Sequence, residues 1–397
     1  MWRPGTAAAS ATEPHLLLER PVVTLADPLL SIHGLQVRLP DGADRSFAVE
    51  NLNLAVGRGE IVCVVGESGS GKSIMAQAVM GILPGNLPAP TGKVMFEGRD
   101  LLAMSQSERL DISGRKISMI FQEPMAALNP IVRVGDQVAE TFRLHTKLSR
   151  DEARRKVLGL FDEVRLPDPE RIFRSYPHQL SGGQCQRVMI ATGLALEPSI
   201  LIADEPTTAL DVTTQAKILE LMLDLRRGHG TGILFITHDF GVVADIADRV
   251  AVMQHGRLVE LGTKDEVLSA PKAPYTQALI RAVPRLEQRA PAEPKGGILL
   301  RAREIAKTYA LPGLFNRGRV IHALDRVDIE LRKGETLGLV GESGSGKSTL
   351  AKCIIRLTEP DGGVIELGDI QFSSLSGSAL RRARSKVQIV FQDPYTA

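Results

Sequence analysis

The nine residues VGESGSGKS occur twice in the chain, at Val65–Ser73 and again, letter for letter, at Val340–Ser348. Each copy contains the pattern G-x-x-x-x-G-K-[ST], in which glycines allow backbone N–H groups to approach phosphate oxygens. The first copy follows the apolar run IVCVV (Ile61–Val65) and precedes SIMAQAVMGIL, whose apolar residues have helical spacing. The sequence therefore predicts a strand, a phosphate-binding loop and a helix, whose N-terminus adds positive charge to the site.

The two loops supply the first candidate binding residues. Lys72 is expected to reach the β and γ phosphates of a nucleotide, and the hydroxyls of Ser73 and Ser348 are expected to bind Mg²⁺. An isolated pattern of this kind could also be a plain glycine-rich turn. The residues assigned to the first loop are Gly66, Glu67, Ser68, Gly69, Ser70, Gly71, Lys72 and Ser73. Those assigned to the second are Gly341, Glu342, Ser343, Gly344, Ser345, Gly346, Lys347, Ser348 and Thr349.

The repetition extends beyond the loops. The first loop is preceded by AVENLNLAVGRGE and the second by ALDRVDIELRKGE, and FQEP (Phe121–Pro124) recurs as FQDP (Phe391–Pro394). The separation from Lys72 to Lys347 is 275 residues. This period is far longer than that of solenoid repeats and indicates a duplicated domain.

Composition shifts set the expected domain limits. Residues 1–27 have the composition of a disordered tail, residues 28–286 form one complete unit, and the second unit covers residues 298–397. Between them, EQRAPAEPKGG (Glu287–Gly297) is polar and rich in Pro, Gly and Ala, which is typical of a linker. The second unit holds only the opening part of the repeat, so we expect uncovered apolar faces and poor stability there.

Charge and hydropathy exclude several classes of protein. Lys and Arg number 48 against 46 Asp and Glu, so the net charge of +2 gives no indication of nucleic-acid binding. No apolar run approaches the roughly 20 residues needed to span a bilayer, and the N-terminus lacks the apolar region of a secretory signal. We therefore expect a cytoplasmic protein. Cys63, Cys185 and Cys353 lack metal-site spacing and are expected to be reduced, mostly packed thiols.

Two further motifs point to nucleotide chemistry. Asp204 and Glu205 end the apolar run ILIA, where the first carboxylate could organise Mg²⁺ and the second could act as a general base. An acidic pair at a strand end could also be a helix cap. LSGGQ combines a Ser hydroxyl with bare Gly backbone at a helix start, which is a second anion-binding arrangement or a simple turn. Its candidate residues are Ser181, Gly182, Gly183 and Gln184.

Three single residues complete the set of candidates. Gln122 follows the strand-like KISMIF and is placed for its amide to coordinate Mg²⁺ or the attacking water, although this position alone favours a plain surface glutamine. His238 ends GILFIT and could donate to a γ-phosphate or be purely structural. Asp211 could be the N-cap of a helix over VTTQAKILEL. Alternating strands and helices around these residues predict a mainly parallel α/β core, with a hairpin turning at His255 and Gly256.

In this order and spacing, the motifs resemble those of ABC transporter ATPase subunits. GESGSGKS resembles Walker A, ILIADEP resembles Walker B, and LSGGQ resembles the family signature; Gln122, Asp211 and His238 resemble the Q-, D- and H-loop residues. The resemblance implies a P-loop NTPase cassette with a RecA-like core, an antiparallel β subdomain and an α-helical signature subdomain, duplicated with an incomplete second copy. It also implies ATP and Mg²⁺ as cofactors.

The resemblance also assigns residues of the second unit and the base site. Gln392 matches the Q-loop residue and a Mg²⁺ ligand, and Tyr309 matches the aromatic residue that stacks on adenine. The corresponding place in the first unit holds Leu39, so the first unit departs from the pattern. In such proteins, Walker A of one cassette faces the signature of another across a shared ATP sandwich. Two identical loops would then serve two nucleotides.

A closer resemblance is to the branch that imports dipeptides, oligopeptides or glutathione, through IFQEPMAALNP, YPHQLSGGQ, IADEPTTALDVTTQA and PYTQALIRAVP. It implies integral membrane permease subunits, a second cassette and, indirectly, an extracellular or periplasmic solute-binding protein as partners. The chain would then lie peripherally on the cytoplasmic face of the membrane. Two alternatives remain open: a tandem-cassette factor acting on ribosomes, or a fragment with one competent cassette.

Overall fold

The computed structural model describes residues 27–208, 210–283, 296–311, 319–342 and 344–391, in two compact units whose main boundary falls between residues 284 and 285. The predicted tail, except Asp27, lies outside the described residues, as does the predicted linker up to residue 295. The first unit contains a six-stranded sheet and a separate four-stranded antiparallel sheet, and the second unit contains one four-stranded sheet.

The six-stranded sheet of the first unit has the strand order β10-β9-β3-β8-β7-β6. Strands β9, β3, β8, β7 and β6 run parallel, and β10 pairs antiparallel with β9 as the predicted hairpin. The mainly parallel core is therefore confirmed. The strands are β3 (Ile61–Val65), β6 (Ile117–Ile120), β7 (Ile200–Asp204), β8 (Gly232–Ile236), β9 (Arg249–Gln254) and β10 (Arg257–Thr263).

Strand β3 shows why the central strands read as unbroken apolar runs. All five of its residues are fully buried. Ile61, Cys63 and Val65 face one hydrophobic cluster, whereas Val62 and Val64 face the other. A parallel sheet covered on both faces needs apolar side chains at every position, since successive side chains point to opposite faces. The strand ends at Val65, the first residue of VGESGSGKS, so the loop begins directly at the edge of a fully buried strand.

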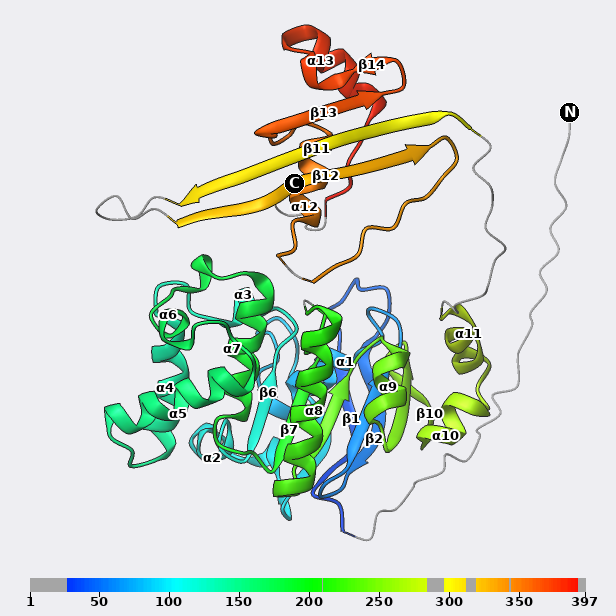
Figure 1. Cartoon of the computed structure of the whole chain (residues 1–397). Coiled ribbons are helices and arrows are strands. Elements are labelled where there is room, and N and C mark those ends of the chain that lie inside the picture. The colour runs from blue at the N-terminus through cyan, green and yellow to red at the C-terminus, as the bar shows by residue number, and fades with distance from the viewer. Residues whose placement is uncertain (1–26, 209, 284–295, 312–318, 343, 392–397) are drawn as a thin grey trace, which may run out of the picture. The chain divides into compact units, whose positions relative to one another are not determined.

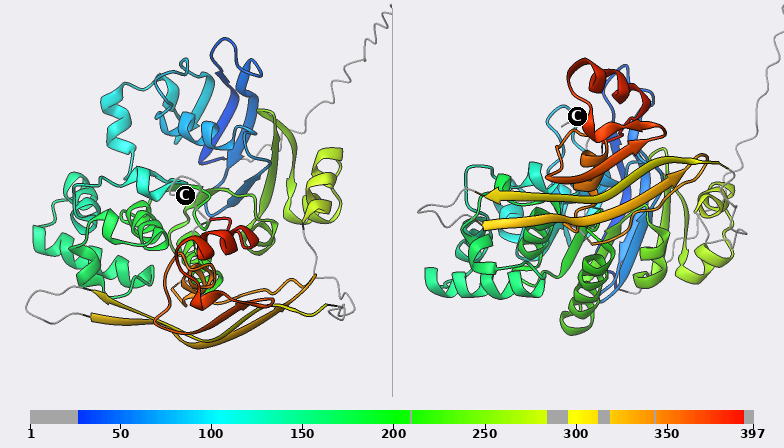
Figure 2. Two further views of the ribbon diagram at one scale, coloured as in Figure 1. Left: turned by 90° about the horizontal axis from the view of Figure 1, so that it is seen from above. Right: turned by 45° about the horizontal axis from the view of Figure 1, so that its top comes forward.

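The second sheet of this unit is antiparallel, with the order β2-β1-β4-β5. It packs on the central sheet together with α1, and their apolar side chains form one of the two clusters of the unit. Figure 1 and Figure 2 show helices α4 to α6 grouped apart from strands β1 and β2. The strands are β1 (Leu30–Arg38), β2 (Phe47–Val56), β4 (Thr91–Phe96) and β5 (Arg99–Asp100).

Helices complete the first unit, and α7 and α8 contribute to the cluster on one face of the central sheet (Figure 1). Several helices begin with a Ser or Thr whose hydroxyl accepts from the N–H three residues on, as in the capping boxes at Ser149 and Ser181. The α-helices are α1 (Lys72–Met80), α2 (Gln106–Ile112), α3 (Pro124–Ala127), α4 (Val134–His145), α5 (Arg150–Glu163), α6 (Pro169–Phe173), α7 (Gly182–Leu194), α8 (Val212–His229), α9 (Phe240–Ile246), α10 (Lys264–Ser269) and α11 (Pro274–Ala282). The 3-10 turns are η1 (Leu101–Ala103) and η2 (Pro177–Gln179).

The second unit repeats the antiparallel sheet of the first. Its strand order β12-β11-β13-β14 corresponds to β2-β1-β4-β5, and β11 and β12 form the long pair in Figure 1. Leu350 and Cys353 of α12 pack on this sheet. The elements are β11 (Ile298–Leu311), β12 (Arg319–Arg332), α12 (Lys347–Ile354), β13 (Gly362–Leu367), β14 (Ile370–Gln371), η4 (Phe372–Ser374), α13 (Gly377–Ala383) and η5 (Arg384–Lys386).

The run TLGLV (Thr336–Val340) enters the second loop but is not a strand, although it stands where β3 stands in the first unit. No strand pairs with it among residues 296–311, 319–342 and 344–391. Val340 is 90% exposed, whereas its counterpart Val65 is 0% exposed. The expectation of uncovered apolar surface in the second unit is confirmed.

Two further expectations concern thiols and membrane spans. The three cysteines are free and buried, as predicted. Burial raises the pKa of the Cys185 thiol to about 11, so this thiol stays protonated at neutral pH. Across the described segments, every helix is too short or too polar to span a bilayer.

Candidate functional site

The first glycine-rich loop is held in a tight conformation between β3 and α1. Gly66, Gly69 and Gly71 have φ values of 152°, 76° and 102°, which lie in the region that favours glycine. A Cβ on Gly66 would lie 2.2 Å from the carbonyl oxygen of Met253 in β9, so the loop could not approach this strand with any larger residue. The helix begins at Lys72, which places the loop at a helix N-terminus as predicted.

Lys72 folds back over the loop. Its Nζ donates to the carbonyl oxygens of Gly66 and Glu67 at 2.8 and 2.9 Å and to Ser70 Oγ at 3.2 Å. Burial lowers the pKa of Lys72, and the charges of Glu205 and Asp204 oppose this shift. A desolvated cation with only neutral acceptors is ready to exchange them for phosphate oxygens.

Three segments from elsewhere in the first unit contact the outside of this loop, and sequence reasoning missed them. The N–H of Gly256, at the β9–β10 turn, donates to the Ser70 carbonyl at 2.9 Å. The N–H of Glu67 donates to the Tyr275 hydroxyl of α11 at 3.1 Å. The Arg45 guanidinium donates to the Gly69 carbonyl. Of these three segments, the sequence analysis identified only the turn at Gly256. It predicted a hairpin there but no contact between that hairpin and the glycine-rich loop.

Asp204 and Glu205 lie at the carboxyl end of β7, as the sequence predicts. Asp204 is 3% exposed, and burial raises the pKa of its carboxyl group. A hydrogen bond with Ser73 and the charge of Lys72 oppose this rise, so these three groups lie close together. Glu205 has a φ of 47°, an uncommon conformation for a residue with a side chain, and it ends the strand.

Three side chains contact the Glu205 carboxylate, two from distant strand ends and one from three residues further along the chain. Gln122 Nε2 donates to Glu205 Oε2 at 3.2 Å, and the Thr208 hydroxyl donates to the same oxygen at 3.2 Å. His238 Nδ1 lies 3.1 Å from Oε1. The structure thus brings together the three predicted catalytic residues Glu205, Gln122 and His238 and adds Thr208. A Thr three residues after an acidic residue carried no signal of its own.

The donor set beside Lys72 fits a hard divalent cation. Asp204 Oδ1 is buried and has no hydrogen-bond partner in the described residues, which is costly unless a ligand satisfies it. The Ser73 hydroxyl lies next to Asp204, and the Gln122 amide donates to the carboxylate of the following residue, Glu205. Carboxylate, hydroxyl and amide oxygens are ligands that Mg²⁺ prefers.

The LSGGQ residues begin α7. Ser181 is the N-cap, and the Gln184 side chain accepts from the Ser181 N–H at 3.0 Å. The predicted helix start after a turn is therefore present. In the described part of the chain, no hydrogen bond joins Ser181, Gly182, Gly183 or Gln184 to the glycine-rich loop or to Glu205. Instead, the buried Gln186 of α7 donates to the Pro206 carbonyl at 2.8 Å, next to Glu205.

The remaining candidates lie outside this cluster. Asp211 directly precedes α8, and the Thr213 hydroxyl donates to its Oδ1 at 2.6 Å. Leu39 is half-buried and packs on the cluster that contains α1. In the second unit Tyr309 is 38% exposed, and the Lys307 ammonium lies 5.8 Å from its ring centroid. Gln392 lies outside the described residues.

The second loop reproduces the first in local geometry. Lys347 Nζ donates to the carbonyls of Gly341 and Glu342 at 2.7 and 2.6 Å and to Ser345 Oγ at 3.3 Å. The loop glycines Gly344 and Gly346 have φ values of 82° and 94°, close to those of the first loop. Ser343 lies outside the described residues, and Ser348 and Thr349 follow Lys347 in the first turn of α12.

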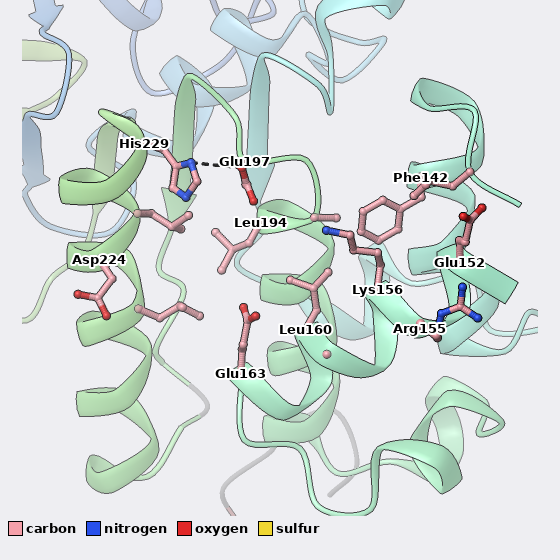
Figure 3. Close-up of a pocket in the computed structure, with 15 residues that line it drawn as sticks. Phe142, Glu152, Arg155, Lys156, Leu160, Glu163, Leu194, Glu197, Asp224 and His229 are labelled. Carbon is pink, nitrogen blue, oxygen red and sulfur yellow. Dashed lines mark ion pairs between the residues drawn. The ribbon is translucent and has the colours of Figure 1, made fainter. Parts of the chain in front are cut away.

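A separate pocket of about 620 Å³ lies between α5, the end of α7 and α8 (Figure 3). Leucine side chains such as Leu160 and Leu194 line it together with charged groups, and His229 Nδ1 lies 3.2 Å from a Glu197 carboxylate oxygen. None of the predicted site residues lines this pocket. The candidate chemistry therefore lies at the loop and the strand ends.

Two family models match the chain. The model described as ABC transporter matches residues 49–208 and 324–396, so it covers both loops. The model described as oligopeptide/dipeptide transporter, C-terminal region, matches residues 259–308, which include Tyr275.

Individual relatives agree with these matches. The glutathione import ATP-binding proteins GsiA of Escherichia coli (strain K12) and Shigella dysenteriae serotype 1 are each 42% identical over 94% of this chain and 65% of their own length. The chain therefore spans about 65% of the length of these relatives. A dimeric post-hydrolysis structure of the ATP-binding cassette MJ0796, bound to ADP and Pi, has a TM-score of 0.55 at 29% identity, covering 59% of this chain and 98% of that one. The cassette cbiO1 from Clostridium perfringens, part of the transporter complex cbiONQ, has a TM-score of 0.50 at 29% identity, covering 62% of this chain and 92% of that one.

Proposed function

Because the chain belongs to the ABC transporter family, we propose that its first unit is an ATPase cassette that powers the import of peptides or glutathione. The observation that carries this proposal is the Glu205 carboxylate, which is held by Gln122, His238 and Thr208 beside a phosphate-binding loop. A general base needs an acceptor oxygen oriented toward the reacting water, and these three side chains orient it.

In this proposal the first loop binds the phosphates of ATP. Lys72 exchanges its carbonyl partners for the β and γ phosphate oxygens, while the α1 N-terminus and loop N–H groups supply further donors. Water attacks the γ-phosphorus, its proton passes to Glu205, and the bond from the γ-phosphorus to the bridging oxygen breaks to release ADP. Gln122 and His238 position the water and the γ-phosphate.

Ser73, Asp204 and Gln122 would hold Mg²⁺, since the unpartnered Oδ1 of Asp204 fits a cation. When bound with ATP, Mg²⁺ neutralises charge that develops on the phosphate oxygens. A bound cation would also stabilise the ionised form of Asp204, because it offsets the desolvation that raises the pKa of this carboxyl group.

Partners and location follow from family membership. We propose integral membrane permease subunits, an indirect solute-binding protein, and a second cassette whose LSGGQ segment completes the nucleotide site, with no nucleic-acid partner. Ser181 to Gln184 begin α7 without hydrogen bonds to their own loop, which fits a role toward another cassette. The protein would act on the cytoplasmic face of the membrane.

The domain limits 28–286, 287–297 and 298–397 also remain proposals, with the second unit as part of a second cassette. Tyr309, Gln392 and the loop from Gly341 to Thr349 would contribute to its nucleotide site. The peptide-importer assignment draws on the match over residues 259–308 and on the GsiA relatives.

The proposal is tested by Glu205→Gln. This change removes the proton acceptor but keeps the size and the hydrogen-bonding shape of the side chain, so ATP should still bind while turnover falls by about 10²-fold or more. Phosphate release and nucleotide binding are measured on the same preparation of the full chain. Glu220→Gln is the control, since Glu220 is an exposed α8 residue whose ion pair within the described residues is with its neighbour Lys217. Near-normal turnover in the Glu205 variant would show that Glu205 is not the general base.

A ribosome-associated tandem cassette is the alternative. It is distinguished by purifying the tagged chain from cells and identifying what accompanies it. We expect integral membrane proteins; ribosomes without membrane proteins would favour the alternative.

A further inference from the structure

We propose that Arg45 is a nucleotide-binding residue that supplies a second positive charge, beside Lys72, to the phosphates at the first loop. This inference rests on the proposed function of that loop. Nothing in the sequence motifs singles out Arg45, because it lies in the segment between β1 and β2 and matches no nucleotide pattern.

The tertiary structure places Arg45 at the edge of the loop. Its Nη2 donates to the carbonyl oxygen of Gly69, and its Nη1 lies 3.5 Å from Nδ1 of His255 at the β9–β10 turn. Arg45 thus lies where three distant segments meet: the β1–β2 connection, the glycine-rich loop and the hairpin turn. The N–H of Gly256 binds the adjacent Ser70 carbonyl in the same region.

The charge of Arg45 has no counter-ion in the described residues. No carboxylate oxygen of the described residues lies within 4.0 Å of its guanidinium, although Asp41 and Asp44 line the same surface hollow. Its Nε is buried and has no hydrogen-bond partner in the described part of the chain. A guanidinium has five N–H donors, and among the described residues its partners are one carbonyl oxygen and one imidazole nitrogen. Donors and charge therefore remain for an anion.

The second loop shows that Arg45 is not needed to shape the first. Val320 stands 275 residues after Arg45 and offers no side-chain donor. Gly344 nevertheless has a φ of 82° against 76° for Gly69, and Lys347 makes the same three contacts as Lys72. Because the second loop has this shape with a valine at the matching position, the loop conformation itself does not require an arginine at that position.

The base site gives a second reason to expect dependence on charge. Leu39 takes the place at which the family resemblance leads us to expect an aromatic residue. An aliphatic side chain offers less to an adenine ring than an aromatic face does. Affinity at the first loop should then depend more strongly on the phosphate end, where Arg45 and Lys72 lie.

The experiment compares binding of MgATP, MgADP and AMP to the full chain and to Arg45→Gln at several ionic strengths. We expect MgATP and MgADP to bind about five-fold more weakly to the variant, the range of a partly exposed charge contact, and their affinity to depend less on salt. AMP should change least. Arg38→Gln is the control, because Arg38 ends β1 just before this segment and its guanidinium carbon lies 5.3 Å from the Phe47 ring centroid.

Arg45→Lys is the second variant, since it keeps the charge and should retain most of the affinity and salt dependence. MgATP affinity within two-fold of the parent chain in Arg45→Gln would overturn the inference. A weaker but equally salt-dependent Arg45→Gln, or Arg45→Lys as weak as Arg45→Gln, would also overturn it by indicating a structural role. Failure of the parent chain to bind MgATP better than Lys72→Ala would instead contradict the proposed function of the loop.

Discussion

The two copies of VGESGSGKS have the same local geometry in very different surroundings. In both, the lysine binds two loop carbonyls and a serine hydroxyl. In the first unit, however, Ile61–Val65 is a fully buried strand between β8 and β9, whereas Thr336–Val340 is not a strand. The loop conformation thus depends on neighbouring residues, whereas the strand before the loop depends on residues far away in the sequence.

The physical reason lies in the hydrogen bonds that each part needs. A glycine-rich loop satisfies its backbone through its own lysine, its own serine and the following helix. A strand satisfies its N–H and C=O groups only through neighbouring strands, which for β3 come from residues far along the chain. Without such neighbours, an apolar run such as TLGLV remains extended and exposed.

The difference in contacts between the loops concerns chemistry as well as stability. The first loop faces Asp204 and Glu205 and is contacted by Arg45, Gly256 and Tyr275. Among the described residues of the second unit, no acidic pair takes the place of Asp204 and Glu205. The described residues thus assemble a complete set of candidate catalytic side chains beside the first loop.

Hydrogen exchange should show the largest contrast. The amides of Ile61–Val65 should exchange at least about 10³-fold more slowly than those of Thr336–Val340, because only the former are in a buried ladder. Exchange of the full chain followed by mass spectrometry measures both segments in one sample. Equal protection would mean that Thr336–Val340 is paired in solution, and the contrast between the units would fail.

Matched substitutions of the two lysines should show the next largest effect. Lys72→Ala should lower kcat/KM for ATP by about 10²-fold, the usual cost of removing a charge stabiliser from a phosphate site. Lys347→Ala should have a smaller effect, because among the described residues Lys347 contacts only its own loop, whereas Lys72 also lies beside Asp204 and Glu205. Steady-state phosphate release measures both. A loss with Lys347→Ala as large as with Lys72→Ala would mean that the second loop works in catalysis.

Asp204→Asn tests the buried carboxylate of the first unit through its effect on the free energy of unfolding. Burial raises the pKa of Asp204 in the folded chain, so protonation of Asp204 stabilises the fold at low pH and this stability is lost as pH rises through the folded-state pKa. At pH 7 the variant should therefore be more stable by about 1 kcal/mol, or about 2–4 °C in Tm, while Mg²⁺-dependent hydrolysis falls.

Thermal unfolding without nucleotide at pH 7 and pH 4 measures the Asp204 effect. The gain should shrink at pH 4, because a larger share of the parent Asp204 is protonated there. Asp224→Asn, an exposed change on α8, should have no effect at either pH. A destabilised Asp204 variant at pH 7 would show that the ionised carboxylate is well solvated or paired.

Much of the first unit could be predicted from periodicity and motif order. The strands Ile61–Val65, Ile200–Asp204 and Gly232–Ile236, and the hairpin at His255, all lie where the sequence indicates. Apolar runs of five residues, bounded by turn residues, identify strands buried on both faces. The candidate residues at strand ends followed from the same pattern, since the carboxyl ends of parallel strands meet at one edge of a sheet.

The sequence by itself determined the loop conformation, because its glycines and its lysine act on neighbours within eight residues. It also determined the identity of the acidic and amide groups that could serve a nucleotide. Only the tertiary structure decided that Arg45 and Tyr275 join the site, since they reach it by long-range packing. It also decided that one of two apolar runs becomes a strand, because strand hydrogen bonds depend on partners that no local pattern supplies.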